Sequence, residues 1–230
     1  MTGDTVQPDT PANKSGLTAR VLSACVLIPP VIAAIYFGSP YFDLLIVAAV
    51  GVMAWEWLGL CDKKPVWILF GVFYIGIPSY ALLHIRSYPE MGFETVIWTF
   101  LLVWAADTGA YFAGRSIGGP KLAPSISPNK TWAGLIGGVG AAGIIGFLVS
   151  LVLDLQNVIP LIILSMFLGL VSQGGDLLES WVKRRFNKKD AGALIPGHGG
   201  VLDRVDGLLA ASLGAALIGY LIEGSALTWG

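Results

Sequence analysis

The sequence has few charged residues. Asp, Glu, Lys and Arg make up 13% of its 230 residues, whereas hydrophobic residues make up 55% and the mean hydropathy is positive. A soluble domain usually has about a quarter of its residues charged. This composition excludes a separate soluble domain and indicates an integral membrane protein.

Cysteines and the common nucleotide-binding motifs are also scarce. The two cysteines, Cys25 and Cys61, fall in or beside apolar segments, which does not suggest a disulfide framework. There is no Gly-x-x-x-x-Gly-Lys-Ser/Thr phosphate loop and no Gly-x-Gly-x-x-Gly after a predicted strand. Soluble nucleotide-binding folds therefore have no support, and we expect no nucleic-acid partner.

Apolar segments long enough to approach a membrane span recur along the chain. They predict an all-α, polytopic helical bundle of about seven spans. The first span contains Pro29 and Pro30 and the sixth is short, so each could be kinked, re-entrant or only shallowly inserted. We expect a disordered polar tail over 1–18 and a single transmembrane domain over 19–230. The segments are 21–36, 44–60, 66–83, 96–112, 133–153, 158–171 and 207–222.

The basic residues predict the orientation, because Lys and Arg accumulate in cytoplasmic loops. With the amino terminus inside, Arg86 is the only one of the 14 Lys and Arg residues that falls outside. The two longest loops, 113–132 and 172–206, then both face the cytoplasm. We expect an active site on that face, in a bacterial inner membrane.

Acidic residues form two groups around the second of these loops. Asp176, Glu179 and Ser180 would share one face of a helix, and Asp203 and Asp206 stand at the start of the last span. Mg²⁺ in nucleotide sites usually takes one or two carboxylates together with substrate phosphates. The acids therefore predict a nucleotide-metal site, and the Lys and Arg residues nearby would neutralise phosphate charge.

Two features of this segment have a simpler alternative. The basic run over 183–189 could anchor anionic lipid headgroups, with the acids as solvated counterions. That alternative is weaker for Asp176 and Glu179, because ionised groups are costly at the end of an apolar helix. The glycines around His198 could form a flexible turn, or backbone that approaches a phosphate with His198 as a further donor.

A second constellation lies near the other predicted loop. Asp107 stands within the fourth span, one turn from Tyr111 and about two turns from Arg115. An acid within a span is usually functional, so Asp107 is a candidate metal ligand or a partner to a base. The alternative is a buried carboxylate paired with a neighbouring helix.

The segment 125–134 is predicted to be a loop that enters the fifth span. Thr131 or Asn129 could cap the helix, and Lys130 would lie beside free backbone N–H groups, which makes an anion site. An ordinary capped helix start is the alternative. In the following span, Gly134, Gly137, Gly138, Gly140 and Gly143 predict close helix packing.

Glu56 is another acid within a span, between Trp55 and Trp57. It could pair with a basic residue of a headgroup site. We favour the alternative, in which it lies near the inner interface with the tryptophans.

The segment from Ser180 to Asp206 resembles the signature of the phosphatidate cytidylyltransferase family. It contains Ser-x-Val-Lys-Arg-x-x-x-x-Lys-Asp, then Gly192 and Ile-Pro, then His-Gly-Gly-Val-x-Asp-Arg-Val-Asp. The segment 127–134 is similar to the family's Ser-Pro-x-Lys-Thr-x-Glu-Gly, except that Ala133 stands where the family usually has Glu. Any role of that Glu in binding or positioning therefore does not carry over to this chain.

The resemblance implies transfer of CMP from CTP to phosphatidate in phospholipid synthesis, which forms CDP-diacylglycerol and pyrophosphate. It implies Mg²⁺ and a second, monovalent cation as cofactors, CTP and membrane phosphatidate as substrates, and is compatible with a homodimer. The expected catalytic residues are Asp176, Asp203, Asp206, Lys183 and Arg204; the expected metal ligands are Asp176, Asp203 and Asp107; and the expected substrate-binding residues are Ser127, Asn129, Lys130, Thr131, Ser180, Arg184, Lys189, His198, Gly199 and Gly200.

Three other functions are alternatives for this chain. A CTP-dependent polyprenol kinase would need similar groups but would pass on only the γ-phosphate. A transporter could use Glu56, Asp107 and Asp176 as an ion path, but most of the charges cluster at one face rather than through the bilayer. A structural scaffold would leave the paired acids and the double-glycine loop unexplained.

Overall fold

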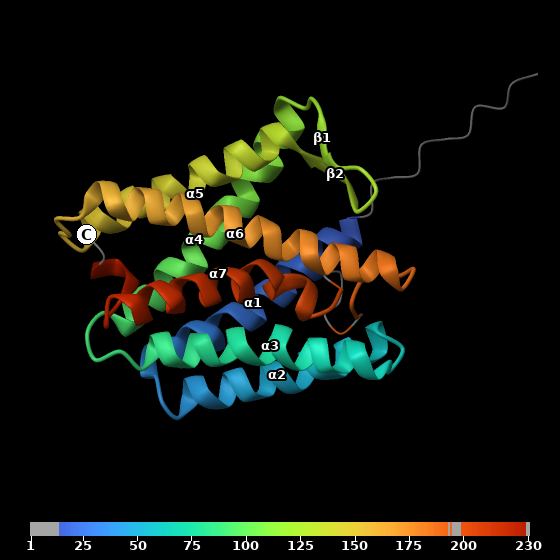
Figure 1. The fold of residues 1–230 in the computed structure, drawn as a ribbon, viewed down its shortest axis with the longest axis horizontal. Helices are drawn as coiled ribbons and strands as arrows, with labels where there is room; N and C mark the ends of the chain where they lie inside the picture. The colour runs from blue at the N-terminus through green and yellow to red at the C-terminus, as the bar shows by residue number, and fades with distance from the viewer. Residues whose placement is uncertain (1–13, 193, 195–198, 229–230) are drawn as a thin grey trace, which may run out of the picture.

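The computed structural model describes residues 14–192, 194 and 199–228. This part of the chain is a bundle of seven helices with one small hairpin (Figure 1), which confirms the predicted all-α membrane architecture. Residues 1–13 of the predicted polar tail lie outside the described residues. The elements are α1 (Lys14–Phe37), α2 (Tyr41–Leu60), α3 (Pro65–Arg86), α4 (Gly92–Ser116), β1 (Lys121–Ala123), β2 (Ser127–Thr131), α5 (Trp132–Val152), α6 (Val158–Arg185), α7 (Leu202–Leu221) and the 3-10 turn η1 (Ala226–Thr228).

Six helices of the described residues, α2 to α7, are long and apolar enough to cross a membrane. In α1, which contains Pro29 and Pro30, the apolar part is the shorter stretch Cys25–Phe37. The prediction of about seven spans is therefore roughly met. Length and hydropathy alone therefore do not identify α1 as a membrane span.

The sixth helix corrects the prediction of a short span over 158–171. α6 has 28 residues and continues through the first part of the predicted 172–206 loop. The first polar residues of this stretch are buried and hydrogen-bonded: Ser172 donates to the Gly169 carbonyl, and Gln173 donates to Asp107. Hydropathy falls along this stretch, but the helix does not end.

The chain between α4 and α5 was predicted to be a loop and instead forms an antiparallel hairpin. Lys121 of β1 pairs with Thr131 of β2. The Thr131 hydroxyl then caps α5 by accepting a hydrogen bond from the Gly134 N–H at 3.0 Å. The predicted Thr131 cap is confirmed.

Helices α4 and α5 pack through small residues. A Cβ atom on Gly138 would lie 2.6 Å from the Ala106 carbonyl oxygen, and one on Gly137 would overlap the Ala113 side chain. Gly143 packs against Met166 of α6 instead. The predicted close packing is confirmed at these positions, whereas Gly140 has no neighbour within 4 Å.

Lys188, just after α6, joins the ends of α6 and α2. Its ammonium group donates to the carbonyl groups of Gly59 and Leu60 and lies 2.8 Å from Asp62. The hydrogen bond from Lys188 lowers the pKa of Asp62, so this ion pair persists at neutral pH.

Arg184 and Arg86 bind at opposite ends of the bundle. Arg184 donates to the Ile126 carbonyl of the hairpin turn at 3.2 Å, whereas Arg86 binds the last turn of α1. Arg184 thus lies at the end of the bundle that carries the hairpin, and Arg86, the one basic residue predicted on the other side of the membrane, lies at the opposite end.

Replacing Gly138 with Ala should destabilise the protein, because the new Cβ atom would be forced against the α4 backbone. Overpacking of this kind costs about 1–3 kcal/mol, more than the gain of up to about 1 kcal/mol in helix propensity. Gly140→Ala is the matched control, since it has the same gain without the contact. Thermal unfolding in detergent should show a lower midpoint for Gly138→Ala only. Equal midpoints would refute the close packing.

Candidate functional site

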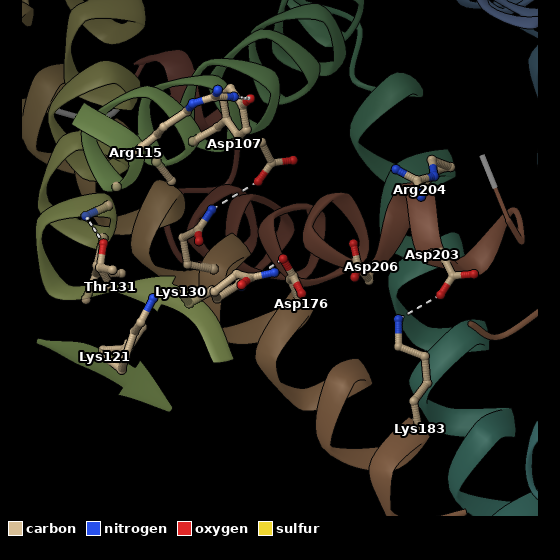
Figure 2. Close-up of a pocket in the computed structure, with 18 of the residues that line it drawn as sticks. Asp107, Arg115, Lys121, Lys130, Thr131, Asp176, Lys183, Asp203, Arg204 and Asp206 are labelled. Atoms are coloured by element: carbon tan, nitrogen blue, oxygen red, sulfur yellow. Dashed lines mark hydrogen bonds and ion pairs between the residues drawn. The ribbon is translucent and has the colours of Figure 1, made fainter. Parts of the chain in front are cut away.

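A cavity of about 770 Å³ opens at the end of the bundle where the basic residues gather (Figure 2). One wall comes from α4, the hairpin and the start of α5, and the other from α6 and α7. Residues from both predicted constellations therefore meet in one place. The predicted residues that line it are Asp107, Asn129, Lys130, Thr131, Asp176, Lys183, Asp203, Arg204 and Asp206.

Other predicted residues lie beside the cavity without lining it. Ser180 donates a hydrogen bond to Asp176 at 3.3 Å, and Arg184 holds the hairpin turn. Gly199 and Gly200 contact Asp203 from the loop before α7. Ser127 begins β2, Lys189 is exposed after α6, and His198 lies outside the described residues.

Lys183 stands between two carboxylates on the wall formed by α6 and α7. Its ammonium nitrogen lies 2.7 Å from an oxygen of Glu179 and 2.7 Å from an oxygen of Asp203. All three side chains are largely buried, so the pairs are shielded from water. Two of the three Lys183 donors are thereby used inside the protein, and one is left for a ligand.

Asp203 also holds the loop that precedes α7. Besides Lys183, it accepts hydrogen bonds from the backbone N–H groups of Ala191 at 3.0 Å and Gly200 at 2.9 Å. A carboxylate has about four lone-pair sites, and these donors occupy most of them. In this arrangement Asp203 fixes the loop and has little capacity left for a metal ion.

Asp176 is a partly accessible acid of the cavity. Its carboxylate lies 2.7 Å from Lys130 of β2, and this ion pair joins α6 to the hairpin. One third of the Asp176 side chain is exposed. Asp107 accepts from Gln173 at 3.0 Å, and Asp206 accepts from the Gly207 N–H at 2.7 Å.

These acids can hold a metal ion only together with further ligands, such as the phosphates of a substrate. Among the described residues, no group of three or more His, Cys, Asp or Glu side chains is placed to hold a metal ion. Mg²⁺ in nucleotide sites needs only one or two carboxylates when phosphates supply further ligands. Asp176, with Asp107 facing the same cavity, fits that requirement.

Glu56 has a role that the sequence did not predict. Its side chain is buried, and its two oxygens accept the backbone N–H groups of Val201 and Leu202, each at 2.9 Å. Gly192 and Gly200 lie so close that a Cβ atom on either would be within 3 Å of this carboxylate. Glu56 thus serves as the acceptor for the free N–H groups at the start of α7, a role that neither expectation for it included.

Several lining residues were not predicted as part of the site. Arg115 and Tyr111 come from the last turns of α4, Lys121 from β1, and Gln173 from α6. Asp190 follows α6. The available signal was the basic residues on both sides of Gly118 and Gly119, in a loop already expected on the same face.

Comparison with known proteins gives a consistent match. The model of the cytidylyltransferase family matches residues 63–222. A phosphatidate cytidylyltransferase of Brucella suis biovar 1 is 50% identical over 155 residues, which cover 67% of this chain and 57% of that protein. The phosphatidate cytidylyltransferase of Rickettsia bellii is 40% identical over 204 residues, which cover 85% of this chain and 87% of that protein.

Replacing Glu56 with Ala should loosen the loop before α7. Two buried N–H groups would lose their acceptor, which costs about 1–3 kcal/mol for each group. Hydrogen exchange of the Val201 and Leu202 amides should accelerate, and the thermal midpoint should fall. Asp43→Ala is the control, because Asp43 lies at the other end of α2 and accepts only from Ser39 in a more exposed position. Unchanged exchange at Val201 and Leu202 would contradict the assignment.

Proposed function

The chain belongs to the cytidylyltransferase family, and on that premise we propose that it transfers CMP from CTP to phosphatidate, forming CDP-diacylglycerol and pyrophosphate. The observation that carries the proposal is the single cavity in which cations and acids from α4, the hairpin, α6 and α7 meet at one end of a membrane bundle. The names of the Brucella and Rickettsia relatives support the choice of phosphatidate as acceptor.

The reaction has to bring two anions together. An oxygen of the phosphatidate phosphate forms a bond to the α-phosphorus of CTP, while the bond from that phosphorus to the oxygen bridging to the β-phosphate breaks. The acceptor is already an anion, so no general base is needed. The site has to reduce electrostatic repulsion and to stabilise the charge that develops on pyrophosphate.

The cations of the cavity supply part of that stabilisation. Lys130 and Arg204 line the cavity and can bind phosphate oxygens through charge-assisted hydrogen bonds. Lys183 orients Asp203 and offers its remaining donor. The backbone of Gly199 and Gly200, fixed by Asp203 and Glu56, borders the same space.

The proposed cofactor is Mg²⁺ that enters with the nucleotide. Asp176 and Asp107 are the best placed to hold it, and Asp206 lines the same cavity, whereas Asp203 is occupied by Lys183 and by the loop before α7. When bound, the ion would neutralise phosphate charge and that of the leaving group. The second, monovalent cation and the homodimer stay predictions.

The cavity is proposed to face the cytoplasm of a bacterial cell, with the protein in the inner membrane. CTP is met on that side, and the basic residues that gather at this end follow the positive-inside pattern. The relatives named above are bacterial.

Labelled CTP tests the proposed reaction and separates it from lipid phosphorylation. With purified protein, Mg²⁺ and phosphatidate, label on the α-phosphate should enter lipid, and label on the γ-phosphate should leave as pyrophosphate. Lipid that carries only the γ-label would instead identify a kinase. Ion flux in vesicles without CTP would favour a transporter.

Asp176→Asn should lower the rate of CDP-diacylglycerol formation by about 100-fold or more, because it removes a charge from the site of phosphate transfer. Asp154→Asn is the matched control, since Asp154 is exposed just beyond α5, away from the cavity. Thermal midpoints should show that both variants fold. Near-normal turnover of Asp176→Asn would remove Asp176 from the proposed metal site.

A further inference from the structure

The cations of the cavity differ in how far their charge is already compensated. Lys130 pairs with Asp176, Lys183 pairs with Glu179 and Asp203, and Arg204 also interacts with another residue. In residues 14–192, 194 and 199–228, neither Arg115 nor Lys121 forms an ion pair with an acid. These two carry charge that remains available for a ligand.

Arg115 and Lys121 are held on the same wall by the turn between α4 and β1. Gly118 and Gly119 both adopt positive φ angles, at 68° and 89°, which lets the chain reverse directly after α4. The hairpin register then fixes Lys121 opposite Thr131. Arg115 is oriented by Tyr111, whose hydroxyl oxygen accepts its guanidinium N–H at 2.7 Å.

Exposed apolar side chains lie near this pair at the end of α4. Phe112 and Ile117, at the same end of α4, are 62% and 74% exposed, and in a membrane bundle such side chains contact lipid. Leu122 and Leu135 line the cavity beside the two cations. The wall of α4 and the hairpin thus combines positive charge with apolar surface.

The opposite wall carries several acids beside Lys183 and Arg204. Figure 2 shows Asp176, Asp203 and Asp206 on α6 and α7, across from Arg115 and Lys121. Carboxylates repel a bare phosphate and favour one that brings a metal ion. The metal-bound triphosphate is therefore better matched to the acids around Asp176, and a phosphate that carries acyl chains to the end of α4 and to β1, where Arg115 and Lys121 lie.

We infer that Arg115 and Lys121 form the subsite for the phosphate of the lipid substrate, at the boundary between the cavity and the bilayer. This inference rests on the proposed function and divides the cavity between its two substrates. Arg115 can offer two parallel N–H donors to a phosphate, and Lys121 adds a point charge. The acyl chains extend past Phe112 and Ile117 into lipid.

Steady-state kinetics in mixed micelles test the division. Arg115→Gln and Lys121→Gln should each raise the apparent KM for phosphatidate about tenfold, as expected for one charged hydrogen bond, and leave the KM for CTP within about twofold. Arg185→Gln is the control, because Arg185 is an exposed cation at the end of α6 that does not line the cavity. A raised KM for CTP with an unchanged KM for phosphatidate would overturn the inference, as would wild-type kinetics in both variants.

A binding measurement without CTP separates this inference from the proposed function. Wild-type protein in phosphatidylcholine nanodiscs should retain added phosphatidate. The double variant, which combines Arg115→Gln with Lys121→Gln, should lose most of this binding while keeping its thermal midpoint. Excess soluble glycerol 3-phosphate should not displace the lipid; equal competition would overturn the assignment to a lipid phosphate. If the wild type retained phosphatidate but made no CDP-diacylglycerol, the proposed function would fail and the lipid subsite would stand.

Discussion

The site depends on buried carboxylates that accept backbone N–H groups. A buried non-helical segment is tolerated only if its backbone N–H and C=O groups find hydrogen-bond partners. Between α6 and α7, Asp203 accepts from Ala191 and Gly200, and Glu56 accepts from Val201 and Leu202. Lys183 in turn offsets the charge of Asp203. The loop can therefore carry glycines and still border the cavity in a defined position.

The other wall is positioned by glycines, whose lack of a side chain allows close helix packing. Glycines on α5 let its backbone approach α4 so closely that the two helices fit together through main-chain atoms. The hairpin between them is then fixed at both ends, by the Thr131 cap on α5 and by Arg184 on α6. The two walls of the cavity are therefore positioned by two unrelated kinds of packing.

Local patterns in the sequence predicted the features that depend on neighbouring residues. Hydropathy located the helices, small residues located the α4–α5 contact, and the Thr131 cap followed from its place before an apolar run. The partners of Glu56 lie about 145 residues away, and no local pattern pairs an acid with distant N–H groups. The hairpin was missed because Ser127–Thr131 lacks the alternation of a strand. The length of α6 was missed because the polar residues that lower its hydropathy, Ser172 and Gln173, are hydrogen-bonded inside the bundle.

Helices α5 and α6 pack closely at one end and diverge toward the other (Figure 1). Near one end, Gly146 packs against Ser165 and the Leu161 carbonyl, whereas at the other end the two helices diverge (Figure 1) and both contribute residues to the cavity. From Gly146 to Gly134 the lever is on the order of 18 Å, at 1.5 Å per residue. A rotation of only about 3° at the joint would change the width of the mouth by roughly 1 Å. The close contacts at Gly146, Gly143 and Gly169 therefore hold the angle between α5 and α6, and the ion pair of Lys130 with Asp176 joins the hairpin to α6 at the far end.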